Sequence, residues 1–108
     1  MEDDAVTASM VTDVTAKYYG IETGELLGKT RAHQVVKARW IAMYLCRELT
    51  SERTPAISRH FGRTYTEVVY YPRKVESEML EEAEVLKQIR EITGIIEARV
   101  TGSGGSRS

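Results

Sequence analysis

The segment 54–75, TPAISRHFGRTYTEVVYYPRKV, constrains the fold more than any other, because its punctuation predicts two helices around a tight turn. Thr54 can cap the first helix, and Pro55 would then occupy the first helical position, where its missing N–H costs nothing. A glycine breaks this helix, and the spacing of Thr64 and Glu67 matches a capping box that opens the second one. Helix, glycine-containing turn and capped helix are the layout of a helix-turn-helix, although other helical hairpins share it.

This hairpin lies in the basic part of an otherwise acidic chain. Residues 1–28 carry a net charge of −5, residues 29–74 hold ten basic and three acidic residues, and residues 75–108 carry −3, so the total is −1. Positive charge gathered around one motif is typical of a surface that binds phosphate. The alternative interpretation is that acidic terminal helices only neutralise a basic middle.

Composition argues against several classes of protein. A single cysteine, Cys46, allows no disulfide framework, and with two scattered histidines, His33 and His60, it does not make a metal site. No stretch approaches the ~20 apolar residues of a membrane span, and the acidic N-terminus lacks the pattern of a signal peptide. No Ser/His/Asp or Cys/His set has a catalytic spacing, so we expect no enzyme. We expect a cytoplasmic protein without cofactor, metal or membrane association.

The apolar spacing predicts an all-α domain of about six helices. A first helix should begin after Ser9, a good N-cap, and end at Gly20, and one short helical turn should follow over 23–27. The segment 33–49 is apolar on nearly every face, which predicts a long, buried central helix. Within it, we expect Trp40 to pack against neighbours rather than to serve as a stacking platform.

The C-terminal segment 76–100 is amphipathic and predicts one or two helices, broken near Glu82 or Gly94. Pro72, inside the second hairpin helix, is expected to kink that helix. The inward-facing apolar positions of the C-terminal segment are expected to be Leu80, Ala83, Leu86, Ile89, Ile92 and Ile96. The predicted organisation is a disordered N-terminus over 1–8, a helix-turn-helix domain over 9–100 and a flexible tail over 101–108.

Two segments are candidates for contact with a partner. The segment from Lys29 to Gln34 is a basic stretch before the long helix, and it is either an ordinary solvated loop or a contact to phosphate and the minor groove. The first two turns of the second hairpin helix should be exposed, with Thr64, Tyr65, Thr66, Glu67 and Tyr70. Glu67 could accept from cytosine in a major groove, but its spacing from the cap favours capping.

The chain also resembles a known family. The segments AKYYGI, ELLGKTR and KARWIAMYLCRELT, followed by the hairpin, are similar to the C-terminal DNA-binding domain of the bacterial replication initiator DnaA, over roughly residues 14–96. The resemblance implies an all-helical, Trp-repressor-like fold with a helix-turn-helix at its centre. It also implies that the basic loop reaches the minor groove of duplex DNA while the second hairpin helix reads bases in the major groove.

The resemblance assigns site residues position by position, with Arg31 as the minor-groove arginine. The expected base-reading set is Thr64, Tyr65, Thr66 and Glu67. The expected minor-groove and phosphate set is Lys29, Arg31, His33, Lys37, Arg39, Pro55, Arg63, Arg73 and Lys74. The chain departs from the family signature Gly-Gly-Arg-Asp-His-Thr-Thr-Val, because one glycine is missing and Thr, Tyr and Glu stand where Asp, His and the second Thr sit.

These observations predict sequence-specific binding of double-stranded DNA, in replication-initiation control or transcriptional regulation, by a nucleoid-associated protein. No Gly-x-x-x-x-Gly-Lys-Ser/Thr loop is present, so no nucleotide is expected to bind. The alternative hypothesis is a protein-interaction module on the same scaffold, in which the altered hairpin has lost base readout and binds a replication or regulatory protein.

Overall fold

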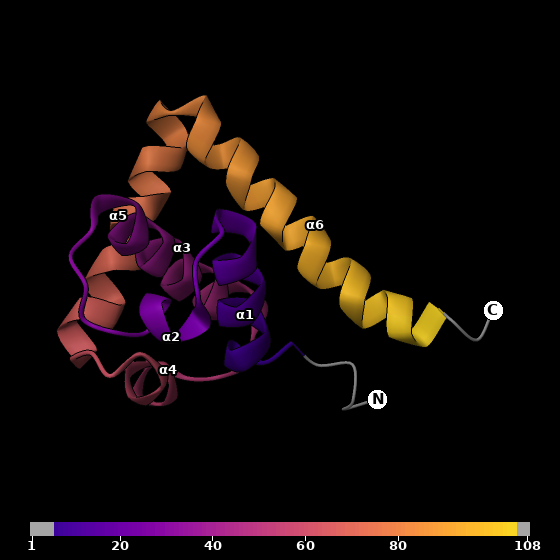
Figure 1. The fold of residues 1–108 in the computed structure, drawn as a ribbon, viewed down its shortest axis with the longest axis horizontal. Helices are drawn as coiled ribbons and strands as arrows, with labels where there is room; N and C mark the ends of the chain where they lie inside the picture. Colours follow the sequence, from indigo (N-terminus) through magenta and orange to yellow (C-terminus); the bar gives the residue numbers. More distant parts are fainter. Residues whose placement is uncertain (1–5, 106–108) are drawn as a thin grey trace.

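The computed structural model describes the backbone of residues 6–105 and the side chains of residues 6–100. Within that range, all regular structure is helical (Figure 1). The helices are α1 (Ala8–Tyr19), α2 (Thr23–Leu26), α3 (His33–Leu49), α4 (Thr54–Phe61), α5 (Tyr65–Glu81) and α6 (Ala83–Gly105). The prediction of an all-α domain of about six helices is confirmed.

Helix α3 is the centre of the fold. It packs against α1, α2, α4 and α5, and its bounds are those that the sequence predicts. Ala38, Ile41, Ala42 and Leu45 are almost wholly buried, and so is Cys46, whose thiol pKa is raised by burial to about 12. A helix with apolar residues on most faces is stable only when neighbours cover it, which explains why four other helices surround this one.

Helix α1 begins two residues earlier than the sequence predicts. Thr7, not Ser9, is the N-cap, and its hydroxyl accepts a hydrogen bond from the Met10 backbone N–H at 3.2 Å. The prediction of Ser9 as the cap was wrong, because Thr7 and Ser9 can both cap a helix and the sequence does not separate them. Ala8 is buried against the core as the first residue of α1, which leaves Thr7 as the cap. The predicted end is confirmed: Gly20 adopts φ 72°, a left-handed conformation that favours glycine.

The helical hairpin is formed by α4 and α5. Arg53 is the N-cap of α4 and Thr54 its first residue, so the predictions of Thr54 as the cap and of Pro55 as the first helical residue were each wrong by one residue. Pro55 is the second residue of α4, where its missing N–H still costs nothing. Gly62 ends α4 with φ 64°, and Ile57 and Phe61 are buried against the core. Since Gly62 supplies the sharp change of direction, only three residues, 62–64, separate the end of α4 from the start of α5.

The corner between α5 and α6 lies at Glu82, one of the two predicted breaks, whereas Gly94 lies inside α6. α5 continues through the buried Pro72 without ending there. The expected burial of Leu80 was wrong: its side chain is 89% exposed, and Ala83 is exposed as well. The extended backbone at Glu82 turns the chain, so Leu80 and Ala83 face solvent at the corner, while Met79 still packs against the core.

Burial resumes on α6 with Val85, Ile89, Ile92 and Ile96, while Leu86 is half-buried. α6 packs on α1 and α5, and two hydroxyls of α1 bind it directly: Tyr18 donates to the Glu91 carboxylate and Tyr19 to the Gln88 side-chain oxygen at 2.6 Å. The helix includes residues 101–105, which the sequence placed in a flexible tail. The rest of that tail, and residues 1–5 of the predicted disordered N-terminus, lie outside the described residues.

Candidate nucleic-acid interface

The N-terminal end of α5 is held by a capping box. Thr64 Oγ1 accepts a hydrogen bond from the Glu67 backbone N–H at 3.1 Å, and Glu67 Oε1 accepts one from the Thr64 backbone N–H at 3.0 Å. The Thr64 hydroxyl also lies 3.2 Å from the same carboxylate oxygen. These bonds satisfy two backbone donors at the helix start. They confirm that Glu67 caps the helix, as its spacing predicts.

The side chains that this end of α5 presents to solvent carry hydroxyls. Thr64 and Thr66 are exposed, and Tyr65 and Tyr70 are exposed over 61% and 55% of their surface. On the opposite face, Val68 is buried in the core. One face of α5 therefore holds the helix in place, while the other offers hydroxyls, a methyl group and aromatic rings to a partner.

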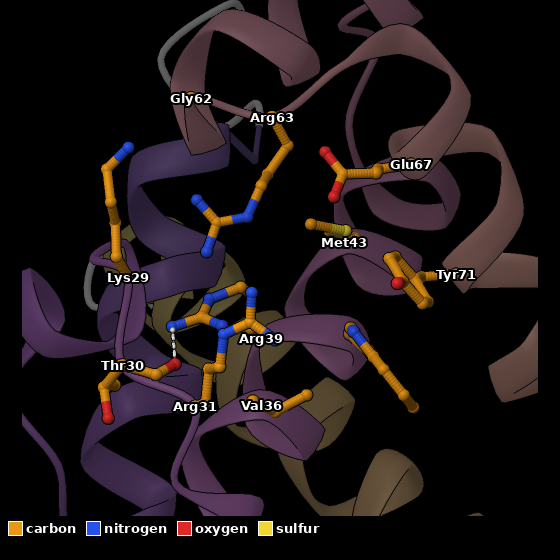
Figure 2. A pocket seen from close by; sticks show the side chains of 11 residues that line it. Lys29, Thr30, Arg31, Val36, Arg39, Met43, Gly62, Arg63, Glu67 and Tyr71 are labelled. Carbon is orange, nitrogen blue, oxygen red and sulfur yellow. Dashed lines mark hydrogen bonds between the residues drawn. The ribbon is translucent and has the colours of Figure 1, made fainter.

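The loop between α2 and α3, residues 27–32, is called the basic loop below. Arg39 of α3 anchors it from beneath, because its Nη2 donates to the Thr30 carbonyl at 3.2 Å (Figure 2). Its Nε donates at 2.7 Å to the carbonyl of Leu26, the last residue of α2. Arg39 is only 4% exposed, and its pKa is lowered by burial and by the neighbouring Arg63 guanidinium. The structure therefore places Arg39, an expected phosphate contact, under the loop rather than on the surface.

Arg63 joins the turn of the hairpin to the same loop. Its Nη2 donates to the Gly28 carbonyl at 2.7 Å, and its Nη1 lies 3.5 Å from the Phe61 carbonyl. The backbone carbonyl of Arg63 in turn accepts a hydrogen bond from the Ser58 hydroxyl of α4. Two guanidinium groups, one from α3 and one from the turn before α5, thus hold the last carbonyl of α2 and two carbonyls of the loop.

A cleft of about 570 Å³ lies between the basic loop and α5 (Figure 2). Four basic side chains line it, those of Lys29, Arg31, Arg39 and Arg63, and within the described part of the chain none of them forms an ion pair. Glu67 also lines the cleft, with its carboxylate engaged in the cap. Four positive groups and one carboxylate leave the opening with an excess of positive charge, which attracts an anionic partner.

The other predicted contacts are spread around this cleft. Lys29 and Arg31 are exposed on the loop, and His33 is exposed in the first turn of α3. Pro55 is exposed at the start of α4, and Arg73 is exposed in the middle of α5. The structure thus brings the loop cations to the cleft and leaves Pro55 and Arg73 on the outer side of the hairpin helices.

The remaining two predicted cations, Lys74 and Lys37, contact side chains of other segments. Trp40 of α3 stacks on Tyr71 of α5, with ring centroids 4.5 Å apart, and Lys74 Nζ lies 5.6 Å from the Trp40 ring centroid. Lys37 forms an ion pair with Glu82 at 4.0 Å. Trp40 therefore packs against α5, and this aromatic contact helps to fix the far wall of the cleft.

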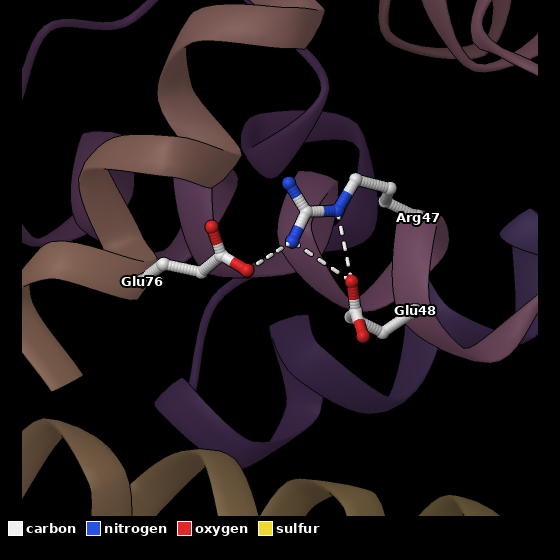
Figure 3. A network of polar contacts seen from close by, with 3 residues as sticks. All are labelled: Arg47, Glu48 and Glu76. Atoms are coloured by element: carbon white, nitrogen blue, oxygen red, sulfur yellow. Dashed lines mark hydrogen bonds and ion pairs between the residues drawn. The ribbon is translucent and has the colours of Figure 1, made fainter.

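A further link between α3 and α5 had no counterpart in the sequence interpretation. Arg47 Nη2 lies 2.7 Å from Glu76 Oε2 and 2.8 Å from Glu48 Oε2, so one guanidinium bridges the two helices (Figure 3). The pair spans 29 positions of the chain, and nothing in the local pattern predicts it. Because all three side chains are partly exposed, we expect the bridge to contribute little free energy but to favour one orientation of α5.

Among residues 6–100, no group of three or more His, Cys, Asp or Glu side chains is arranged to hold a metal ion. Across the described helices, none combines the length and the apolar content that crossing a bilayer requires.

The fold and the interface together define a helix-turn-helix domain of the DNA-binding class, with a capped second helix beside a basic loop. Residues 8–75 match the family described as bacterial dnaA protein helix-turn-helix, and the chain belongs to that family.

Two curated relatives extend this match. The chain is 40% identical over 94 residues to the chromosomal replication initiator protein DnaA of Mycobacteroides abscessus, a region that covers 87% of this chain and 19% of that protein. It is 42% identical over 93 residues to the protein of the same name from Corynebacterium jeikeium, covering 85% of this chain and 16% of that one. The chain thus spans less than a fifth of the length of these relatives.

Proposed function

We propose that this chain binds double-stranded DNA by placing the N-terminal end of α5 in a major groove and the basic loop against the adjacent minor groove. The observation that carries the proposal is the cleft, which Lys29 and Arg31 of the loop line on one side and Glu67 and Tyr71 of α5 on the other. The exposed residues 64–66 lie beside it, at the start of α5. A duplex presents its two grooves on either side of one phosphate backbone, which fits a cationic opening between two contacting elements.

The proposed base-reading residues are Thr64, Tyr65 and Thr66. Their exposure at the start of α5 supports this role, since the first residues of a recognition helix lie closest to base edges. A hydroxyl can donate to or accept from a base, and the threonine methyl can contact a thymine methyl. Glu67 supports the set by capping the helix, and its carboxylate is the group least suited to a phosphate-rich surface.

The proposed minor-groove residue is Arg31, with Lys29 beside it on phosphate. The exposure of both side chains, without ion-pair partners among the described residues, leaves them available to a duplex. We assign His33 and Arg73 to the flanking phosphates on the same grounds. Lys37, Pro55 and Lys74 are proposed as weaker contacts at the edge of the interface.

The family and the names of the relatives support a role in replication-initiation control, with transcriptional regulation as the other use of the same binding activity. We propose residues 9–100 as the binding unit and the cytoplasmic nucleoid as its location. No catalytic or nucleotide-dependent step is part of the proposal.

The test is a selection from random duplexes, followed by fluorescence-anisotropy titration of the selected site at several salt concentrations. Arg31→Ala should weaken binding and lower the salt slope by about 0.9 if one phosphate contact is lost. Thr66→Ala should change the selected sequence instead. The matched control is Lys87→Ala, because this exposed side chain of α6 makes no contact that the interface uses. Absence of duplex binding at low salt would refute the proposal.

One observation favours the second candidate, a protein-interaction module. Tyr65 and Tyr70 expose large aromatic surfaces in the first two turns of α5, and exposed tyrosine is common in protein interfaces. A protein that binds this face would lose affinity on Tyr70→Ala and keep it on Arg31→Ala, the reverse of the pattern expected for DNA.

A further inference from the structure

We infer that Arg63 is a positioning residue that couples the two DNA-contacting elements, so that the minor-groove contact of Arg31 depends on the bond from Arg63 to the basic loop. The inference rests on the proposed function, because it concerns how the loop and α5 act together on one duplex. It assigns Arg63 a role other than the direct phosphate contact that its charge alone predicts.

The first argument is how little else holds the loop. Within residues 27–32, Ala32 N–H bonds only to the neighbouring Thr30 hydroxyl, and the N–H groups of Leu27 and Gly28 bond back into α2. The side chains from elsewhere that donate to loop carbonyls are Arg39, which binds Thr30, and Arg63, which binds Gly28. Their two guanidinium groups therefore decide how the loop is placed.

The second argument is where these two arginines come from. Arg39 belongs to α3, the helix that the loop leads into, so its bonds place the loop relative to its own element. Arg63 lies 35 positions from Gly28 in sequence and directly precedes Thr64, the cap of α5. Among the described side chains it alone ties the hairpin turn to a loop carbonyl by a hydrogen bond.

The third argument is that the hairpin end of this link is itself fixed. The Arg63 carbonyl accepts from the Ser58 hydroxyl of α4, and the Arg63 N–H donates to the Ser58 carbonyl at 3.1 Å. Thr64 is then fixed by the capping box. The distance from the start of α5 to the loop is thus set by a short chain of bonds, and the free protein already holds the two elements in one arrangement.

The consequence is energetic. A loop that is ordered before binding loses less conformational entropy when it enters a groove, so releasing it weakens the contact made by Arg31 without removing Arg31. If Arg63 acts in this way, the Arg63 and Arg31 variants both lose the binding free energy of the same minor-groove contact. Their losses of binding free energy are then not additive.

The experiment is a double-mutant cycle on the selected duplex, with Arg31→Ala, Arg63→Met and the double variant. Methionine keeps an unbranched apolar stem at position 63 and removes the guanidinium. Each single variant should weaken binding about tenfold, and the double variant should also lose about tenfold rather than a hundredfold. Arg73→Ala is the matched control: it removes the same charge from α5, and its effect should multiply with that of Arg31→Ala.

The second readout is base preference. Arg31→Ala and Arg63→Met should flatten the selection between A·T and G·C at the same flanking positions, and both should leave the positions read by α5 unchanged. A general loss of structure would weaken every position alike. If Arg63→Met does not fold, Arg63→Lys replaces it in both measurements, because one ammonium does not reproduce the two-nitrogen geometry of arginine.

Multiplicative effects of Arg31→Ala and Arg63→Met, or full wild-type affinity and base preference with Arg63→Met, would overturn the inference while duplex binding itself stands. A protein that binds no duplex at low salt fails the proposed function instead, so the two failures are distinguishable.

Discussion

The capping box at the start of α5 can be tested by Thr64→Ala. In the structure, Thr64 Oγ1 accepts from the Glu67 N–H at 3.1 Å and helps to hold the Glu67 carboxylate, which in turn accepts from the Thr64 N–H at 3.0 Å. Both groups are accessible to water, which would replace the lost bonds in part. We therefore expect a loss of about 1 kcal/mol in the free energy of unfolding, within the range for N-cap threonines.

The assay is urea denaturation followed by far-UV circular dichroism, with an unchanged slope showing that the unfolded state is the same. A loss of this size corresponds to a fall in the unfolding midpoint temperature of roughly 4–8 °C for a domain of this size. Glu67→Ala should cost a similar amount, and the double variant should cost less than the sum, because the two residues act on one structure.

Thr66→Ala is the matched control, since it removes the same kind of side chain from the second residue of α5. Thr66 is exposed and makes no hydrogen bond with the described residues. This control should leave the free energy of unfolding within about 0.5 kcal/mol of wild type. If Thr64→Ala is no more destabilising than Thr66→Ala, the cap does not hold the helix and the capped state of Glu67 is not the one in solution.

Two further predictions concern the loop anchor and the contact between α1 and α6. Arg39→Met removes the donors to the Leu26 and Thr30 carbonyls, so urea denaturation should show a loss of about 1–3 kcal/mol, and an unchanged midpoint would contradict the anchoring role. The hydrogen bond to Glu91, together with burial, raises the pKa of Tyr18 to about 12, so the folded state holds the phenol proton more tightly than the unfolded state, where the pKa is about 10. The free energy of unfolding that this contact contributes is therefore present below pH 10 and is lost as the pH rises toward 12. Between about pH 8 and about pH 11, the free energy of unfolding should fall less in Tyr18→Phe than in wild type, as measured by urea denaturation.

Helix boundaries were predictable where local chemistry alone decides them. The bounds of α3, the end of α1 at Gly20 and the cap at Thr64 follow from periodicity, a left-handed glycine and the spacing of two side chains. The exposure of Leu80 was not predictable, because the amphipathic pattern continues smoothly across Glu82 while the chain turns there. Periodicity reports which positions share a face, but it does not report what that face meets.

Some features of the candidate site could likewise be predicted from the sequence, and others could not. Basic residues near the hairpin could be found from the sequence by charge, and the cap by spacing. The anchoring roles of Arg39 and Arg63 could not, because their acceptors are backbone carbonyls, which every residue carries. An arginine that binds phosphate and an arginine that binds a carbonyl in its own protein look alike in a sequence, and only burial and geometry separate them.

The fold also explains how a chain with a net charge of −1 can attract a polyanion. α5 has 17 residues and is therefore about 25 Å long. The basic cleft lies toward its N-terminal end. The acidic corner, which carries Glu78, Glu81, Glu82 and Glu84, lies where α5 meets α6 (Figure 1). At physiological ionic strength the screening length is about 8 Å, so a duplex at the start of α5 is largely screened from this corner, and the two regions meet at the ion pair between Lys37 and Glu82. The total charge is then a poor guide to the potential that DNA meets. The separation favours approach with the cleft first, and the acidic corner weakens the non-specific contacts that a uniformly basic domain of the same size would make.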